Sequence, residues 1–173
     1  MNREKISIMD HGTEMLGALQ QGVYLTTRSG DRINTMVIGW GTVGIIWGKP
    51  VFICYVRESR YTRELLDSIS EFTVNMPIGP YDRSIFELCG SKSGRDMDKI
   101  SAAGLTPVEG STVSVPALAE FPMTLECRVL YRQEQDLGLI PGHILDVYYP
   151  DNGSGADGHI AYIGEIVDSY ILS

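Results

Sequence analysis

The spacing of apolar and polar side chains along the chain predicts many short strands and few helices. Apolar positions alternate with polar ones over 123–131, as in a strand with one buried face. An unbroken apolar run over 51–56 predicts a strand buried on both faces. Further strands are predicted over 23–27, 33–39, 42–47, 71–76 and 159–172, the last as one strand or as two with a bend near Gly164.

Helical spacing is found over 10–19, where Asp10 is a candidate cap and Met15, Leu16 and Leu19 fall on one face. Other helices are predicted over 63–69, with Ser59 or Thr62 as the cap, over 81–88, and over 96–103, closed by Gly104. Residues 144–149 fit either a strand or a short helix, and 151–158 read as a turn-rich loop.

This order of elements favours a mainly β fold, a β-barrel with peripheral helices, over a doubly wound α/β sheet. The length of 173 residues suits one domain, and no repeat or linker divides the chain. We therefore expect a single domain over 1–173, with 1–18 as an N-terminal extension that carries the first helix.

Charge and composition exclude several classes of function. Fourteen basic and 22 acidic residues give a net charge of −8, which argues against a nucleic-acid binder. The three cysteines and three histidines form no metal-binding motif, so the sequence supports neither a metal site nor a disulfide framework. No targeting signal or membrane-spanning stretch is found, so we expect a cytoplasmic protein with no membrane partner.

One glycine motif resembles a dinucleotide fingerprint. Gly39–Gly44 matches GxGxxG after a predicted strand, but that motif must be followed by a helix. The following residues, 45–50, are rich in β-branched side chains and end at Pro50. The sequence therefore argues against a Rossmann fold.

The strongest local signal is the strand-to-helix junction over 56–62. Arg57, Ser59, Arg60 and Thr62 gather there, where the N–H groups of a helix start are free to bind an anion. Arginine adds forked donors that suit phosphate oxygens. The junction is therefore either a site for one or two phosphates or a capped surface helix with solvated arginines.

Two further clusters carry weaker signals. Asn34, Met36 and Trp40 share one face of the predicted strand, which suits a planar ring with polar edges or else a strand with an outward Asn and core Met and Trp. Residues 91–99 are small, polar and basic ahead of a helix, which fits an anion nest but more simply an ordinary loop.

From Leu19 onward the chain resembles the flavin reductase-like FMN-binding family. The blocks that carry the resemblance follow one another in order along the chain: 22–27, 34–41, Lys49-Pro50, 56–62, 93–96, Asp98-Lys99, His159 and 163–166. The resemblance implies a split β-barrel that binds FMN non-covalently and works as a homodimer.

Matching positions assign candidate cofactor-binding residues. The resemblance places Asn34, Thr35, Met36 and Trp40 around the flavin and its ribityl chain, Arg57, Ser59, Arg60 and Thr62 at the phosphate, and Ser93, Gly94 and Lys99 where the site closes. His159 matches a family histidine near the flavin ring and is the one candidate catalytic residue, with an exposed loop-end histidine as the alternative.

The implied function is an FMN-dependent oxidoreductase, an NAD(P)H-dependent flavin reductase that passes electrons to free flavin, a protein partner or a small acceptor. The alternatives are a flavoredoxin-like electron carrier without NAD(P)H activity and, less favoured, a non-redox binding protein. Residues 137–158 depart from compact members as an inserted loop, which either covers the flavin or contacts the second subunit.

Overall fold

The computed structural model describes residues 1–151, 153 and 155–173, so positions 152 and 154 of the predicted 151–158 loop lie outside the described residues. The strands are β1 (Arg3–Lys5), β2 (Val23–Ser29), β3 (Arg32–Ile38), β4 (Gly41–Ile46), β5 (Lys49–Arg57), β6 (Glu71–Met76), β7 (Pro107–Val108), β8 (Ala117–Leu118), β9 (Met123–Glu134) and β10 (His159–Leu172). The helices are α1 (Gly12–Gln21), α2 (Tyr61–Ile69), α3 (Arg83–Ser91), α4 (Lys99–Ala102) and α5 (Gly142–Tyr148), with a 3₁₀ turn over Leu137–Leu139.

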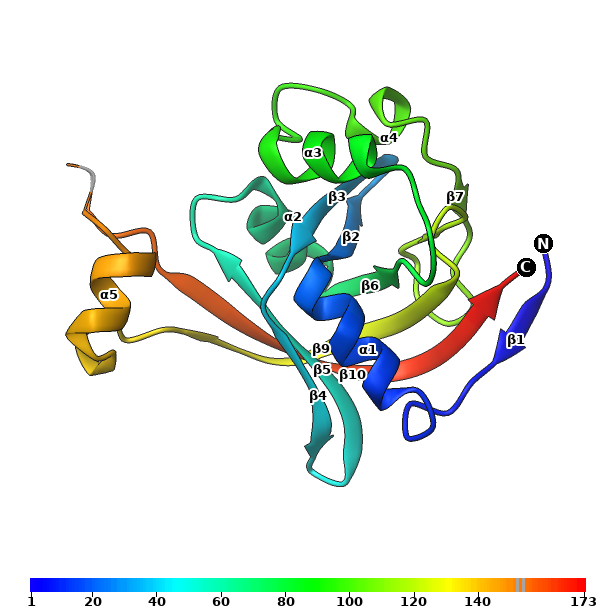
Figure 1. The fold of residues 1–173 in the computed structure, drawn as a ribbon, viewed down its shortest axis with the longest axis horizontal. Helices are drawn as coiled ribbons and strands as arrows, with labels where there is room; N and C mark the ends of the chain where they lie inside the picture. Colours follow the sequence, from blue (N-terminus) through cyan, green and yellow to red (C-terminus); the bar gives the residue numbers. More distant parts are fainter. Residues whose placement is uncertain (152, 154) are drawn as a thin grey trace.

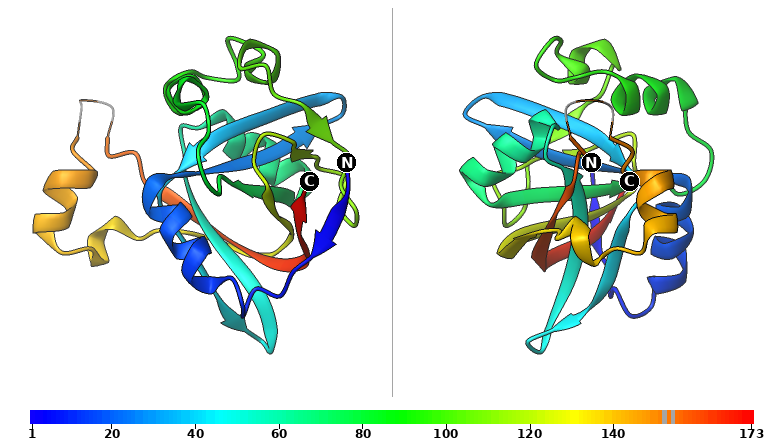
Figure 2. Two further views of the ribbon diagram at one scale, coloured as in Figure 1. Left: turned by 45° about the vertical axis from the view of Figure 1, so that its right-hand side comes forward. Right: turned by 90° about the vertical axis from the view of Figure 1, so that its left-hand side faces the viewer.

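The main sheet is antiparallel throughout and curls around one core, which confirms the predicted mainly β fold. Its strands follow the order β3-β2-β6-β9-β10-β5-β4, and β1 pairs with the far end of β10. Figure 2 shows the sheet wrapped around its interior, with helices on the outside. The core cluster includes Phe52, Phe72, Leu125 and Tyr162, all buried.

Helices α1 to α4 each cover part of the barrel with a face that carries buried side chains. Helix α1 buries Met15, Ala18 and Leu19, spaced as one helical face requires. Helix α2 buries Leu65 and Leu66 and packs against β2, β3 and β5. Helices α3 and α4 pack on β3 (Figure 1).

The long strand β10 is continuous, and its predicted bend is a bulge. Its pairing with β9 shifts register between Ile163 and Gly164. A Cβ atom at Gly164 would lie 2.6 Å from the ring of Phe72 on β6, so the glycine leaves room for this core side chain against the backbone of β10.

Four local predictions were wrong. The strand predicted over 42–47 ends at Ile46, because Trp47 and Gly48 both adopt positive φ and form the β4–β5 turn, after which β5 starts at once with Lys49. Neither Ser59 nor Thr62 caps α2, whose N-cap is Arg60 with no side-chain hydrogen bond. The helix predicted from Asp96 begins at Lys99, because Asp98 caps it. The first helix also starts after His11 rather than at Asp10.

The inserted segment 137–158 forms an arm that projects from the barrel. It joins the end of β9 to the start of β10. Residues 144–148 lie in the helix α5, so the helix is the correct one of the two alternatives predicted for 144–149. Figure 1 shows α5 standing away from the barrel body, at the end of the two long strands. In the described part of the chain, no helix has the length and apolar character needed to cross a membrane.

Candidate functional site

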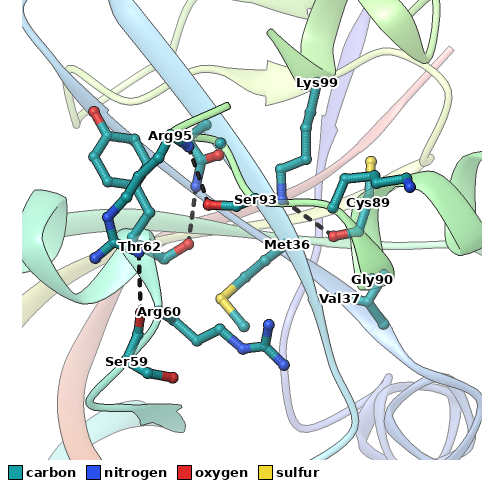
Figure 3. A pocket seen from close by; sticks show the side chains of 14 residues that line it. Met36, Val37, Ser59, Arg60, Thr62, Cys89, Gly90, Ser93, Arg95 and Lys99 are labelled. Atoms are coloured by element: carbon teal, nitrogen blue, oxygen red, sulfur yellow. Dashed lines mark hydrogen bonds between the residues drawn. The ribbon is translucent and has the colours of Figure 1, made fainter. Parts of the chain in front are cut away.

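Three segments far apart in the sequence meet at one cavity of about 140 Å³. They are the middle of β3, the start of α2 and the loop between α3 and α4, as Figure 3 shows. Eight predicted site residues line this first cavity: Asn34, Met36, Ser59, Arg60, Thr62, Ser93, Gly94 and Lys99. The structure therefore brings together residues from all three clusters that the sequence singled out, including the 91–99 loop.

The first cavity is rich in cations. Arg60, Lys92, Arg95 and Lys99 line it, and the described residues of its wall include no carboxylate. The Arg60 side chain makes no hydrogen bond or ion pair with the described part of the chain, and in the view of Figure 3 it enters the cavity opposite Lys99. Such a donor set is suited to a phosphate group.

Lys99 is the most unusual of these cations because only 3% of it is exposed. Its Nζ donates to the carbonyl oxygen of Cys89 at 3.1 Å. The pKa of Lys99 is lowered to about 8, chiefly by burial; Cys89 opposes this shift, and the charge of Arg60 acts in the same direction as burial. An anion in the cavity would supply the counter-charge that this ammonium group lacks.

A buried hydrogen bond connects two walls of the first cavity. Asn34 Nδ2 donates to Thr62 Oγ1 at 2.9 Å, which joins β3 to the first turn of α2. A Cβ atom at Gly94 would lie 2.0 Å from Asn34 Oδ1, so this position accepts no side chain without displacing Asn34. Arg32 Nη2 donates to the Gly94 carbonyl oxygen and holds the loop against β3.

The arm contacts two residues that the sequence assigned to the phosphate. Ser59 donates through its backbone N–H and its hydroxyl to the Asp157 carboxylate, at 3.1 and 2.6 Å. The Arg57 guanidinium donates to the carbonyl oxygens of Asp157 and Tyr148, at 2.7 and 2.8 Å. These donors are therefore already engaged, and Arg60 is the arginine of the junction that remains available.

A second cavity, of about 220 Å³, adjoins the first and shares Met36, Val37 and Arg60 with it. Its wall also includes Trp40, Tyr55, Arg57 and His159. Apolar and aromatic side chains dominate here, with two arginines, which suits a planar ring system.

His159 is not an exposed loop-end histidine, because only 6% of it is accessible. Its ring centroid lies 4.8 Å from that of Trp40, and its Nδ1 lies 3.0 Å from the Tyr149 hydroxyl. Burial lowers the pKa of His159 to about 4, with the Arg57 charge acting in the same direction. The imidazole is therefore neutral near pH 7.

One predicted site residue does not line either cavity. The Thr35 side chain points to the opposite face of β3, where its hydroxyl lies 3.1 Å from Thr26 Oγ1 and donates to the Leu25 carbonyl oxygen. Several lining residues were not predicted: Val37, Ile38, Gly39, Tyr55, Tyr61, Cys89, Gly90, Lys92 and Arg95. A usable signal existed for Tyr55, which lies two positions before Arg57 and so shares its face of β5.

Comparison with known proteins identifies the family. The model of the flavin reductase like domain matches residues 16–170. The chain belongs to the flavin reductase-like domain family. It is 31% identical over 129 residues to an uncharacterized protein of Archaeoglobus fulgidus, covering 74% of this chain and 72% of that protein.

Solved structures of flavin reductase-like proteins share this fold. A flavoredoxin of Desulfovibrio vulgaris (Miyazaki F) superposes with a TM-score of 0.65 and 25% identity, covering 87% of this chain and 68% of that chain. An FMN-binding domain of a flavin reductases-like enzyme from Shewanella baltica OS155 gives a TM-score of 0.66 at 17% identity, covering 98% and 77%. The predicted split β-barrel is thereby confirmed for this member of the flavin reductase-like domain family.

Proposed function

We propose that this protein is a flavoprotein oxidoreductase that binds FMN non-covalently in the two joined cavities. One observation carries the proposal: a cationic cavity whose described wall lacks carboxylates opens into an aromatic cavity through shared residues. A phosphate matches the first cavity in charge, and a planar ring with polar edges matches the second. The residues present therefore fit FMN, and the family assignment supports the same cofactor.

The candidate residues divide into two groups by the chemistry of their cavities. Arg60, Lys99, Thr62 and Ser93 would hold the phosphate through charge and hydroxyl groups. Met36, Trp40 and Tyr55 would pack against the ring, while Asn34 contributes a buried amide to the wall of the first cavity. When bound, the flavin supplies the hydride and single-electron chemistry, and the protein supplies its position and electrostatic surroundings.

The side chains of the second cavity determine which charges and protons are present there. His159 is neutral near pH 7, so it would act in this cavity as a hydrogen-bonding group and not as a positive charge. The positive charge comes from Arg60 and from Arg57, whose guanidinium the arm carbonyls orient. These cations would stabilise negative charge that develops on a bound redox group.

NAD(P)H is the proposed electron donor, with free flavin, a redox protein or a small molecule as acceptor. A flavoredoxin-like electron carrier without NAD(P)H activity is the second candidate. The match to the flavin reductase like domain model supports the first candidate, and the flavoredoxin at 25% identity supports the second. The sequence holds no separate nicotinamide-binding motif that decides between them.

Two measurements on the purified protein test the proposal. FMN is first titrated into the apoprotein and followed by flavin fluorescence, and saturable binding is expected. The loaded protein is then mixed anaerobically with NADH or NADPH. Bleaching by either nucleotide supports the reductase, and bleaching by dithionite alone supports the carrier. A protein that takes up no FMN contradicts both.

We also propose a homodimer, as the family resemblance implies. The support is apolar surface on α1, the loop before it and the β4–β5 hairpin, where Met9, Leu16, Ile45 and Trp47 are all at least 60% exposed. Sedimentation at micromolar concentration should give a dimer, and the Trp47→Lys variant should shift it toward monomer. A monomeric wild-type protein would contradict this proposal.

A further inference from the structure

A chain of hydrogen bonds runs from the base of the arm to His159. The Tyr149 hydroxyl donates to Gln135 Oε1 at 2.9 Å and lies 3.0 Å from His159 Nδ1. Gln135 directly follows β9, Tyr149 directly follows α5, and His159 is the first residue of β10. The hydrogen bonds therefore link three segments at the base of the arm. The backbone N–H of Gln135 also donates to the His159 carbonyl oxygen at 2.9 Å.

The direction of these bonds determines where the imidazole proton lies. A tyrosine hydroxyl has one proton, and in this arrangement that proton is donated to Gln135. Toward His159 the same oxygen can therefore only accept, so Nδ1 must carry the hydrogen. In a neutral imidazole the other nitrogen, Nε2, is then a hydrogen-bond acceptor.

Packing against two aromatic rings fixes the orientation of the His159 imidazole beside the second cavity. The Tyr149 ring meets the imidazole edge-on at 89°, and Trp40 lies against it at 39°. Nδ1 is engaged by the Tyr149 hydroxyl, and Nε2 makes no hydrogen bond within the described residues. Because His159 lines the second cavity and Tyr149 does not, Nε2 is the ring nitrogen left to face that cavity.

We propose that Tyr149 and Gln135 are positioning residues that hold His159 in its Nδ1–H tautomer, so that the second cavity presents Nε2 as an acceptor to a ligand N–H or O–H group. The tautomer follows from the geometry of the apoprotein. That the ligand is FMN rests on the proposed function. The consequence is selectivity, because a ligand with only acceptor atoms at this position would leave two acceptors facing each other.

Nitrogen NMR reads the tautomer directly. In apoprotein labelled with ¹⁵N-histidine, a long-range ¹H–¹⁵N correlation at neutral pH distinguishes protonated from unprotonated ring nitrogens. The expected spectrum of His159 shows a protonated Nδ1 and an unprotonated Nε2. The reverse pattern would mean that Tyr149 donates to the histidine, and it would overturn the proposal.

Variants distinguish a role of Tyr149 and Gln135 in positioning His159 from a general role in stabilising the arm. Tyr149→Phe removes the acceptor for the Nδ1 hydrogen, and Gln135→Leu frees the tyrosine proton to be donated to Nδ1. Both should shift the tautomer toward Nε2–H, whereas Gln135→Glu should keep the wild-type pattern. Tyr148→Phe is the matched control, since the Tyr148 hydroxyl has no partner in the described residues, and it should change nothing. An unchanged tautomer in both Tyr149→Phe and Gln135→Leu would contradict the positioning role.

Adding FMN separates this proposal from the proposed function. FMN that binds and shifts the Nε2 resonance supports the acceptor role, and FMN that binds with no change at Nε2 overturns it. If FMN does not bind at all, the proposed function fails and the flavin is excluded as the donor, while the tautomer measured in the apoprotein still stands.

Discussion

The Asn34 side-chain amide donates to the Thr62 hydroxyl oxygen at 2.9 Å, and both side chains are almost entirely buried. This bond holds the strand that lines both cavities against the helix start that lines the first. It therefore contributes both to the stability of the fold and to the shape of the candidate site.

Asn34→Ala should lower the free energy of unfolding by about 1–3 kcal/mol, because it leaves the buried Thr62 hydroxyl without its partner. Urea denaturation measures this loss. Thr62→Val removes the other partner, and in the double variant the two losses should be less than additive. Strict additivity would show that the two side chains do not depend on each other.

Arg60→Ala should weaken FMN binding roughly 10- to 100-fold, the usual contribution of a charged hydrogen-bonding group. Arg57→Ala should weaken it less, since that guanidinium is engaged by two arm carbonyls. Arg63→Ala is the control, because its side chain bonds to Glu58 and Asp67 outside both cavities. Fluorescence titration gives the three dissociation constants, and equal losses for Arg57 and Arg60 would contradict this ranking.

FMN affinity should decrease as the pH rises from 7 to 9. The pKa of Lys99 is lowered by burial to about 8, so the ammonium group that would face the phosphate is lost in this range. Lys99→Met should bind FMN weakly and show no such pH dependence. If the wild-type affinity does not change between pH 7 and 9, Lys99 does not contact the phosphate.

His159 should make the protein sensitive to acid. Because burial lowers its pKa from 6.5 to about 4, the unfolded chain takes up the proton first as the pH falls. Stability should therefore be lost between pH 6.5 and 4, by about 3 kcal/mol in total at 1.4 kcal/mol per pKa unit. Denaturation of wild type and His159→Gln across this range isolates the contribution, and identical pH profiles would contradict it.

Sequence patterns predicted the parts of the fold that depend on local periodicity. The strand over 71–76 has the observed bounds, because its side chains alternate between two packed layers. The bounds of the β4–β5 hairpin were missed at Trp47, since a large aromatic residue at positive φ contradicts local preference. Exposed to 63%, Trp47 is at the tip of the hairpin and not in a strand.

The predicted site residues other than Thr35 line the two cavities, but the sequence did not predict the contacts that they make. The residues of 91–99, taken by themselves, favoured an ordinary loop over an anion-binding one. In the structure, α3 and α4 pack on β3 and bring Ser93 and Lys99 to the same cavity as Arg60. The engagement of Ser59 by Asp157, 98 residues later, has no local signal at all. Long-range contacts of this kind depend on the fold as a whole.

The arm that carries Tyr149 also supplies the carbonyls that hold Arg57 and the carboxylate that engages Ser59. A deletion that shortens the segment between Glu134 and His159 would therefore change three properties at once. They are the placement of the Arg57 guanidinium, the hydrogen bonding of Ser59 before α2, and the tautomer of the His159 imidazole. In this protein the length of the arm and the electronic environment of the second cavity are therefore coupled, so grafting the arm onto another split barrel would transfer a chemical setting as well as a shape.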